Sequence, residues 1–153
     1  MQVLILAAGK GSRMGNLTNS THKSLLKVND SESFLTQLLN QLQEYPIDNI
    51  FIVTGYKSDQ IESVINNYQV KISTIFNKKY DEDTNIYSMK LALDKVDLNK
   101  NLLIIEADTY VDDYALKNIM DATKKNESFF FTRGYFNESM IGGIVLPNNE
   151  NII

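Results

Sequence analysis

The first 28 residues constrain the fold more than any other part of the chain. Residues 3–6 form an apolar run that is short enough to be a buried strand rather than a helix. The residues that follow have very small side chains: Ala7, Ala8, Gly9, Gly11 and Ser12. Such a turn lets backbone N–H groups converge on an anion, and the usual anion is a phosphate. The stretch therefore predicts a strand that ends in a phosphate-binding loop.

Two cations accompany this loop. Arg13 can grip phosphate oxygens with its planar guanidinium, whereas Lys23 acts as a compact point charge. Together with the converging N–H groups, these side chains indicate a polyphosphate as the ligand.

Two common phosphate loops do not fit the spacing. A Walker-type loop needs Lys directly after its second Gly, but Lys10 precedes Gly11. The dinucleotide fingerprint should open straight into a helix. Here the spacing to Gly15 is one residue too long, and residues 16–20 have the composition of a loop rather than a helix.

The pattern that remains is L-A-A-G-x-G-[ST]-R-[ML] at residues 6–14, followed by Thr21, Lys23, Leu25 and Val28. It resembles the signature of the sugar-phosphate nucleotidyltransferases and their relatives, the bacterial choline-phosphate cytidylyltransferases. One position departs from the family, which usually has Pro where this chain has His22. We expect this change to loosen the loop and to leave the Lys23 cation in place.

Strand and helix patterns alternate along the rest of the chain. Strands are predicted at residues 49–54, 70–76, 102–105 and 128–132, with another beginning at 141. Helices are predicted at residues 34–45, 58–67 and 114–125, with a further helix carrying Ile86, Met89, Leu93 and Val96. This order predicts an α/β fold of right-handed βαβ units. The resemblance implies a Rossmann-like nucleotidyltransferase fold, with a mixed, mainly parallel sheet flanked by helices.

Composition limits the class of protein. The 153 residues suit one domain, and 43% hydrophobic with 22% charged residues is typical of a globular protein. A net charge of −4 argues against nucleic acid as a partner. The chain has no cysteine and no run long enough to cross a membrane. We expect a cytoplasmic protein without membrane insertion, and the sequence leaves an oligomer possible.

A polar segment at residues 77–88 follows the third predicted strand. One interpretation is a solvated loop in which Thr84 or Asn85 caps the next helix. The family resemblance implies another, in which this segment forms a wall of the base pocket. Asn85 and Ser88 would then hydrogen-bond the pyrimidine edge, for which an Asn amide offers both a donor and an acceptor.

Acidic residues end the strand at 102–105. Such groups are costly at the end of a core strand unless they are paired or bound to a metal, and Mg²⁺ prefers one or two carboxylates with phosphate oxygens and water. Asp108 matches the metal-binding Asp of the family, so the resemblance implies that it holds Mg²⁺. The alternative role for Asp108 is a turn or helix cap. We assign no function to Glu106, which replaces the usual first Asp or Gly.

The resemblance implies a nucleotidyltransferase, in which NTP and a phosphorylated acceptor give an NDP-acceptor and pyrophosphate. The catalytic residues would be Arg13, Lys23 and Asp108. The nucleotide-binding set would be Leu6, Ala7, Ala8, Gly9, Lys10, Gly11, Ser12, Arg13, Lys23, Asn85 and Ser88. CTP is the implied nucleotide, and choline phosphate or a related small phosphate or phosphonate is the implied acceptor. Two alternatives stay open: a sugar-1-phosphate uridylyl- or thymidylyltransferase, and a catalytically incomplete nucleotide-binding module.

The end of the chain has the pattern of an interrupted hairpin. Residues 147–151 resemble a turn, and residues 152–153 resemble the start of its return strand. We therefore expect residues 1–153 to be a single nucleotidyltransferase-type domain whose carboxyl-terminal part is missing.

Overall fold

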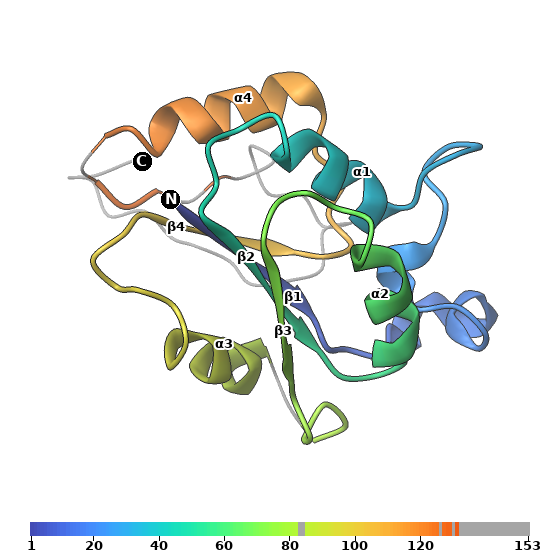
Figure 1. The fold of residues 1–153 in the computed structure, drawn as a ribbon. Coiled ribbons are helices and arrows are strands. Elements are labelled where there is room, and N and C mark those ends of the chain that lie inside the picture. The colour runs from blue at the N-terminus through green and yellow to red at the C-terminus, as the bar shows by residue number, and fades with distance from the viewer. Residues whose placement is uncertain (83–84, 126, 130, 132–153) are drawn as a thin grey trace, which may run out of the picture. The chain divides into compact units, whose positions relative to one another are not determined.

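The computed structural model describes residues 1–82, 85–125, 127–129 and 131 (Figure 1). The chain divides into two compact units, Met1–Asp113 and Tyr114–Ile153. The first unit holds the sheet and all the residues predicted to form the site. Helix α4, Asp113–Ala122, makes up most of the described part of the second unit and carries two ion pairs to Asp121, from Lys117 and Lys124.

A four-stranded sheet forms the centre of the first unit, in the order β3-β2-β1-β4. The strands are β1 Gln2–Ala7, β2 Asn49–Thr54, β3 Ile72–Phe76 and β4 Leu102–Glu106. Every pairing among them is parallel, with Leu4 of β1 opposite Phe51 on one side and Ile104 on the other. The four strands predicted from apolar runs are confirmed, and their carboxyl ends all lie at one edge of the sheet.

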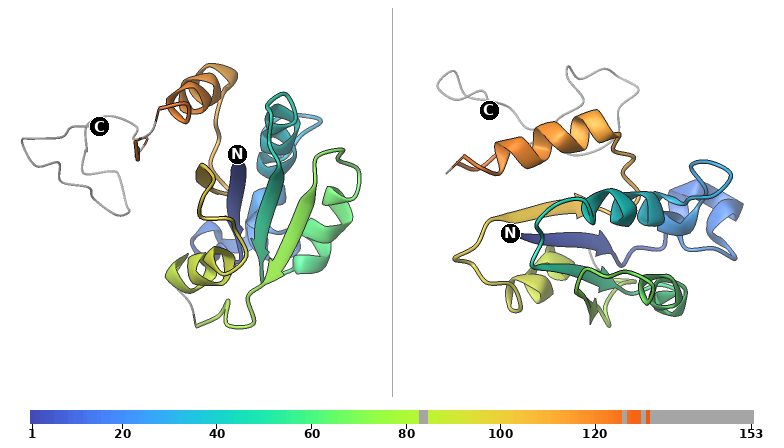
Figure 2. Two further views of the ribbon diagram at one scale, coloured as in Figure 1. Left: turned by 60° about the vertical axis from the view of Figure 1, so that its left-hand side comes forward. Right: turned by 45° about the horizontal axis from the view of Figure 1, so that its top comes forward.

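Helices cover both faces of this sheet (Figure 2). Helices α1, Phe34–Leu42, and α2, Ser58–Ile65, lie on one face, and α3, Asn85–Leu93, lies on the other. Side chains of β1 alternate between the two faces of the sheet. Val3 and Ile5 are completely buried, and Leu4 and Leu6 belong to the cluster that packs with Ala92. The predicted α/β class with a sheet flanked by helices is confirmed.

Helix α1 begins as predicted and ends early. The Ser33 side chain accepts a hydrogen bond from the Thr36 N–H, and Thr36 Oγ1 accepts from the Ser33 N–H, which makes a capping box. The prediction placed the helix end at Tyr45, but the α-helix ends at Leu42. The Tyr45 N–H bonds to the Leu42 carbonyl, so the last predicted residues form a tighter turn instead.

Burial differs from the apolar sequence pattern in two elements. Helix α3 buries Ser88 and Ala92, whereas Ile86 is 76% exposed. The strand at 102–105 was predicted to be buried, but Ile104 is 41% exposed. Helix α3 packs mainly against β1 and β2, so Ile104 in the middle of β4 stays partly exposed.

The segment at 16–20, predicted as loop rather than helix, lies partly in a short 3₁₀ helix. This helix, η1, spans Ser12–Thr18 and is interrupted at Gly15, whose φ of 57° is not helical. A second 3₁₀ helix, η2, spans Lys23–Leu25. Neither is the α-helix that a dinucleotide fingerprint requires, so the exclusion of that motif is unaffected.

The predicted strand at 128–132 is not seen at Ser128, Phe129 or Phe131, and its remaining residues lie outside the described part of the chain. The strand predicted from residue 141 and the interrupted hairpin at 147–153 also lie outside it. In the part of the chain that is described, none of the helices has the length and apolar character that crossing a bilayer requires.

Candidate functional site

The candidate site lies at the carboxyl edge of the sheet, where the loops after three strands are joined by backbone hydrogen bonds. The Tyr56 N–H donates to the Ala8 carbonyl at 3.0 Å, and the Ala107 N–H donates to the Leu6 carbonyl at 3.0 Å. Parallel strands bring their carboxyl ends together, and open α/β sheets bind ligands there. The residues after β1, β2 and β4 therefore form one connected rim.

The glycine loop, residues 7–15, turns sharply at Gly11. Its φ of 68° lies in the left-handed region that favours glycine. A Cβ at Gly11 would also lie 3.0 Å from Lys23 Cβ and 3.1 Å from Thr18 Cγ2. The hydroxyl of Thr18 donates to the Gly11 carbonyl at 3.3 Å. Backbone conformation and the close approach of Lys23 both require glycine at this position.

Lys23 and Asp108 meet across this rim. Lys23 Nζ donates to Asp108 Oδ2 at 3.0 Å, and the two side chains are 18% and 21% exposed. Lys23 begins η2, and Asp108 follows the end of β4. The sequence predicted a role for each residue, and the structure brings the two into direct contact.

The other predicted cations lie farther out. Arg13 is exposed, and its side chain makes neither an ion pair nor a hydrogen bond with the residues that the structure describes. Lys10 Nζ lies 2.5 Å from Asp81 Oδ1 and 5.9 Å from the centre of the Tyr80 ring. The hydrogen bond to Asp81 raises the Lys10 pKa, so this side chain is cationic at neutral pH. Lys10 thus connects the glycine loop to the segment after β3.

The two residues predicted to read the base occupy different environments. Asn85 is exposed, and its Nδ2 donates to Glu106 Oε1 at 2.8 Å. Ser88 is buried, and its hydroxyl accepts from Asn77 Nδ2 at 2.9 Å. Asn85 therefore lies at the rim beside the end of β4, whereas Ser88 lies beneath it. Thr84, the alternative cap of this helix, lies outside the described residues.

His22 does not loosen the loop, contrary to the prediction. The side chain is completely buried, and its Nδ1 accepts from the Ser24 N–H at 3.2 Å, so that it caps η2. Its φ of −62° is one that Pro also adopts, but Pro would lack the N–H that His22 donates here to Gln60 Oε1 at 2.8 Å. Among the described residues His22 Nε2 has no hydrogen-bond partner.

The electrostatics keep this histidine neutral. Burial, and then the charge of Lys23, lower the His22 pKa to about 4, although the Ala7 backbone acts in the opposite direction. A neutral imidazole can accept the Ser24 N–H, which an imidazolium cannot do. The cap of the helix that carries Lys23 therefore depends on an unprotonated ring.

The sequence interpretation missed several residues that shape the rim. Gln60 of α2 bonds to the backbone of Ser20 and His22, both at 2.8 Å, and nothing in the sequence distinguishes this glutamine from others. Gly55 could have been identified from the sequence, because a glycine directly after an apolar strand indicates a turn or a close approach of neighbouring backbone. A Cβ at Gly55 would lie 2.5 Å from Tyr80 Cβ and 2.8 Å from the Ala8 carbonyl oxygen.

The carboxylates after β4 are oxygen donors of the kind that a divalent cation takes. Asp108 offers a carboxylate whose Oδ2 is held by Lys23, and Glu106 follows from the same strand end. The described residues contain no cluster of three or more His, Cys, Asp or Glu side chains that could hold a metal alone. That donor set suits a hard cation that also takes phosphate oxygens and water.

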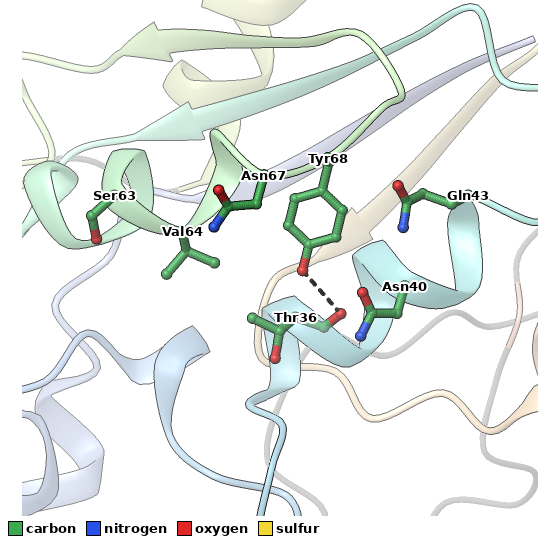
Figure 3. Close-up of a pocket in the computed structure, with 7 residues that line it drawn as sticks. All are labelled: Thr36, Asn40, Gln43, Ser63, Val64, Asn67 and Tyr68. Carbon is green, nitrogen blue, oxygen red and sulfur yellow. Dashed lines mark hydrogen bonds between the residues drawn. The ribbon is translucent and has the colours of Figure 1, made fainter.

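The structure also has a separate pocket between α1 and α2 (Figure 3). Its volume is about 360 Å³, and the Tyr68 hydroxyl beside it donates to the Thr36 carbonyl at 3.5 Å. The lining residues are uncharged: Thr36, Asn40, Gln43, Ser63, Val64, Asn67 and Tyr68. None of them belongs to the predicted site. A phosphate ligand needs cations and converging N–H groups, so the strand-end rim is the better candidate.

Comparison with known proteins identifies related nucleotidyltransferases. A model of the MobA-like NTP transferase domain family matches residues 3–137. The chain is 40% identical over 132 residues to the choline-phosphate cytidylyltransferase of Haemophilus influenzae, covering 86% of this chain and 52% of that protein.

Solved structures agree in fold. The CTP:phosphocholine cytidylyltransferase from Streptococcus pneumoniae is similar with a TM-score of 0.62 and 34% identity, over 71% of this chain and 45% of that one. The inositol-1-phosphate CTP transferase from T. maritima gives a TM-score of 0.64 and 25% identity, over 77% and 47%. The chain spans about half the length of these relatives.

Proposed function

This chain belongs to the MobA-like NTP transferase domain family, and from that membership we propose that it transfers CMP from CTP to a small phosphorylated acceptor. A phosphate oxygen of the acceptor attacks the α-phosphorus of CTP. The bond from the α-phosphorus to the bridging oxygen of the β-phosphate breaks, and pyrophosphate leaves. Residues 1–153 then supply the nucleotide-binding part of one nucleotidyltransferase domain.

The observation that carries this proposal is the contact between Lys23 and Asp108 beside the glycine loop. Their separation of 3.0 Å places a cation and a carboxylate at the same point of the rim. A nucleotide triphosphate and its metal ion require such a pair of opposite charges. Lys23 would move onto the α-phosphate, where negative charge develops in the transition state.

The glycine loop holds the rest of the triphosphate. Backbone N–H groups of residues 8–12 and the Arg13 guanidinium would bind the β- and γ-phosphates. Arg13 is suited to this role because it is exposed and its side chain is not engaged by the described residues. The attacking acceptor oxygen is already anionic at neutral pH, so the reaction needs no general base. Catalysis consists of positioning and charge neutralisation.

Asp108 would hold Mg²⁺. When bound, the ion would neutralise phosphate charge and orient the triphosphate. The chain's own contribution is to present one carboxylate that Lys23 holds by an ion pair.

The nucleotide and the acceptor are proposed from the relatives. Two solved structures, at 34% and 25% sequence identity, have CTP in their names, together with phosphocholine and inositol-1-phosphate respectively. We propose CTP as the nucleotide and choline phosphate, or a similar small phosphate or phosphonate, as the acceptor. A cytoplasmic location, where nucleoside triphosphates are abundant, suits this reaction.

Nucleotide choice tests the proposal. We expect CTP to bind more tightly than UTP, ATP or GTP by roughly 1–3 kcal/mol, the usual cost of leaving a buried polar group unpaired. Asn85→Ala should remove most of this preference and leave phosphate affinity nearly intact, because Asn85 lies at the rim beside Glu106. Calorimetric titration with the four nucleotides measures both effects.

Asn99→Ala is the matched control, since Asn99 precedes β4 and bonds to Asp97, away from the rim. A clear preference for UTP would instead support a sugar-1-phosphate uridylyl- or thymidylyltransferase. Tight CTP binding without pyrophosphate release in the presence of acceptors would support a catalytically incomplete nucleotide-binding module.

A further inference from the structure

Helix α2 holds the segment that leads into Lys23 by three hydrogen bonds. Lys57 Nζ donates to the Asn19 carbonyl at 2.6 Å. Gln60 Nε2 donates to the Ser20 carbonyl at 2.8 Å, and Gln60 Oε1 accepts from the His22 N–H at 2.8 Å. Two of the three bonds come from one side chain, and they clasp the backbone on both sides of Thr21.

We propose that Gln60 is a positioning residue for the nucleotidyl transfer, acting through the backbone of His22 to place Lys23. The inference rests on the proposed function, because it assumes that Lys23 binds the triphosphate. Gln60 itself touches neither phosphate nor metal in this assignment. Its effect on nucleotide binding must therefore pass through Lys23.

Gln60 has both the chemistry and the support for this role. An amide offers a donor and an acceptor on one rigid plane, so it can clasp a carbonyl and an N–H together. The next residue, Ile61, is completely buried and anchors this turn of α2. The amide is thus presented from a fixed element, and Lys57, which can only donate, cannot replace its bond to His22.

The contact is transmitted directly to Lys23. His22 is the residue before Lys23, and the His22 carbonyl accepts from the Leu25 N–H at 2.8 Å to form η2. At the other end of the side chain, Lys23 Nζ bonds to Asp108. This bond to Asp108 fixes the ammonium group in the structure. If the ammonium group turns to a phosphate, the hydrogen bonds from Gln60 to the backbone of Ser20 and His22 still fix the position of Lys23.

A double-mutant cycle with CTP as the probe tests the inference on the full 153-residue chain. Gln60→Ala should weaken CTP affinity about three- to tenfold, as expected for the loss of one or two hydrogen bonds. In the Lys23→Met background, Gln60→Ala should have no further effect. Equal weakening in both backgrounds, or unchanged affinity in the Lys23 background, overturns the inference.

Two further variants make the cycle specific. Gln60→Glu keeps an acceptor for the His22 N–H but loses the donor to Ser20, so its CTP affinity should lie between wild type and Gln60→Ala. If Gln60→Ala does not fold, the same cycle is run with Gln60→Glu, and equal weakening in both backgrounds again overturns the inference. The matched control is Gln43→Ala, whose side chain accepts from the Gln69 N–H away from the rim and should bind CTP as wild type does.

The cycle also separates this inference from the proposed function. If the wild-type chain does not bind CTP, or if Lys23→Met binds it as wild type does, the proposed function fails and the role of Gln60 fails with it. If Lys23→Met weakens binding and Gln60→Ala does not, only the role of Gln60 is overturned.

Discussion

Lys23 and Asp108 lie 85 positions apart in the sequence and form one ion pair at the rim of the sheet. Both side chains are mostly buried, so each charge depends on the other for its neutralisation. A triphosphate would compete with Asp108 for the ammonium group of Lys23. The ion pair thus holds the Lys23 ammonium group at the place where the proposed reaction needs a cation.

We expect Lys23→Met to lower turnover about 10²-fold or more, by analogy with the loss of one oxyanion donor. The free energy of unfolding should fall by about 1–3 kcal/mol, because the Asp108 carboxylate is only 21% exposed and would lose its cation. Turnover assays with CTP and acceptor, and urea denaturation, measure the two effects.

Lys27→Met is the control, since Lys27 Nζ donates to the exposed Ser31 carbonyl at 3.0 Å. An active Lys23→Met variant would contradict the assignment of Lys23 to the α-phosphate.

His22 makes a second prediction at the scale of the residue. Its pKa falls from 6.5 in the unfolded chain to about 4 in the folded protein, because burial disfavours the imidazolium. Between these values the unfolded state binds more protons, so stability falls as the pH is lowered. The contribution is complete above pH 6.5 and is lost by about pH 4, with a total of about 3 kcal/mol.

His22→Asn isolates this effect. Asn can cap η2 in the same way but does not titrate, so the variant should lose less stability than wild type between pH 6.5 and 4. Chemical denaturation at several pH values measures the difference, and the single histidine of the chain can also be titrated directly by NMR. Parallel pH profiles, or a His22 midpoint near 6.5, would contradict the prediction.

At the scale of the element, Gly55 shows how closely three connections approach. It follows β2, and its Cα hydrogen faces both the Ala8 carbonyl after β1 and the Tyr80 side chain after β3. The Tyr80 ring also lies 6.3 Å from that of Tyr56. The glycine is required here by the close approach of neighbours rather than by backbone conformation.

Gly55→Ala should destabilise the fold by about 1–3 kcal/mol, the usual cost of overpacking. Its methyl group would lie 2.5 Å from Tyr80 Cβ and 2.8 Å from a backbone oxygen, so neighbours have to shift. Gly9→Ala is the matched control, because the nearest atoms to its methyl group are 4.0 Å away. Thermal denaturation of both variants tests the prediction. A Gly55→Ala variant as stable as Gly9→Ala would show that the segments carrying Ala8 and Tyr80 can shift at little cost.

At the scale of the whole molecule, the proposed site joins loops from β1, β2 and β4, so ligands should stabilise the first unit as one body. Binding to the native state raises stability in proportion to the logarithm of ligand concentration over Kd. The chain has a net charge of −4, and CTP adds further negative charge. We therefore expect CTP to need a divalent cation for most of its stabilising effect.

Asp108→Asn tests this coupling. The substitution preserves shape and removes the charge, so the additional rise in Tm that Mg²⁺ gives in the presence of CTP should largely disappear. Thermal denaturation with CTP, with Mg²⁺ and with both compares the variant with wild type. Asp112→Asn, which alters a carboxylate outside the proposed site, is the control. A metal response retained in Asp108→Asn would mean that the ion is held elsewhere.

The sequence by itself determined the strands, the glycine loop and the chemistry of its cations. Apolar runs such as residues 3–6 have few alternatives once buried, and glycine at position 11 is fixed by local backbone geometry. The family signature at residues 6–14 also supplied the expectation for Lys23 and Asp108. These features depend on neighbours in the chain, so a pattern in the sequence can reveal them.

Tertiary structure alone decided which of these residues meet. Whether Ile86 or Ser88 is buried depends on the position of α3 over β1 and β2, which helical periodicity does not specify. Gln60 became part of the site because α2 lies beside the segment before Lys23. Hydrogen bonds between distant segments follow from how the elements pack, so no local pattern in the sequence could have identified them.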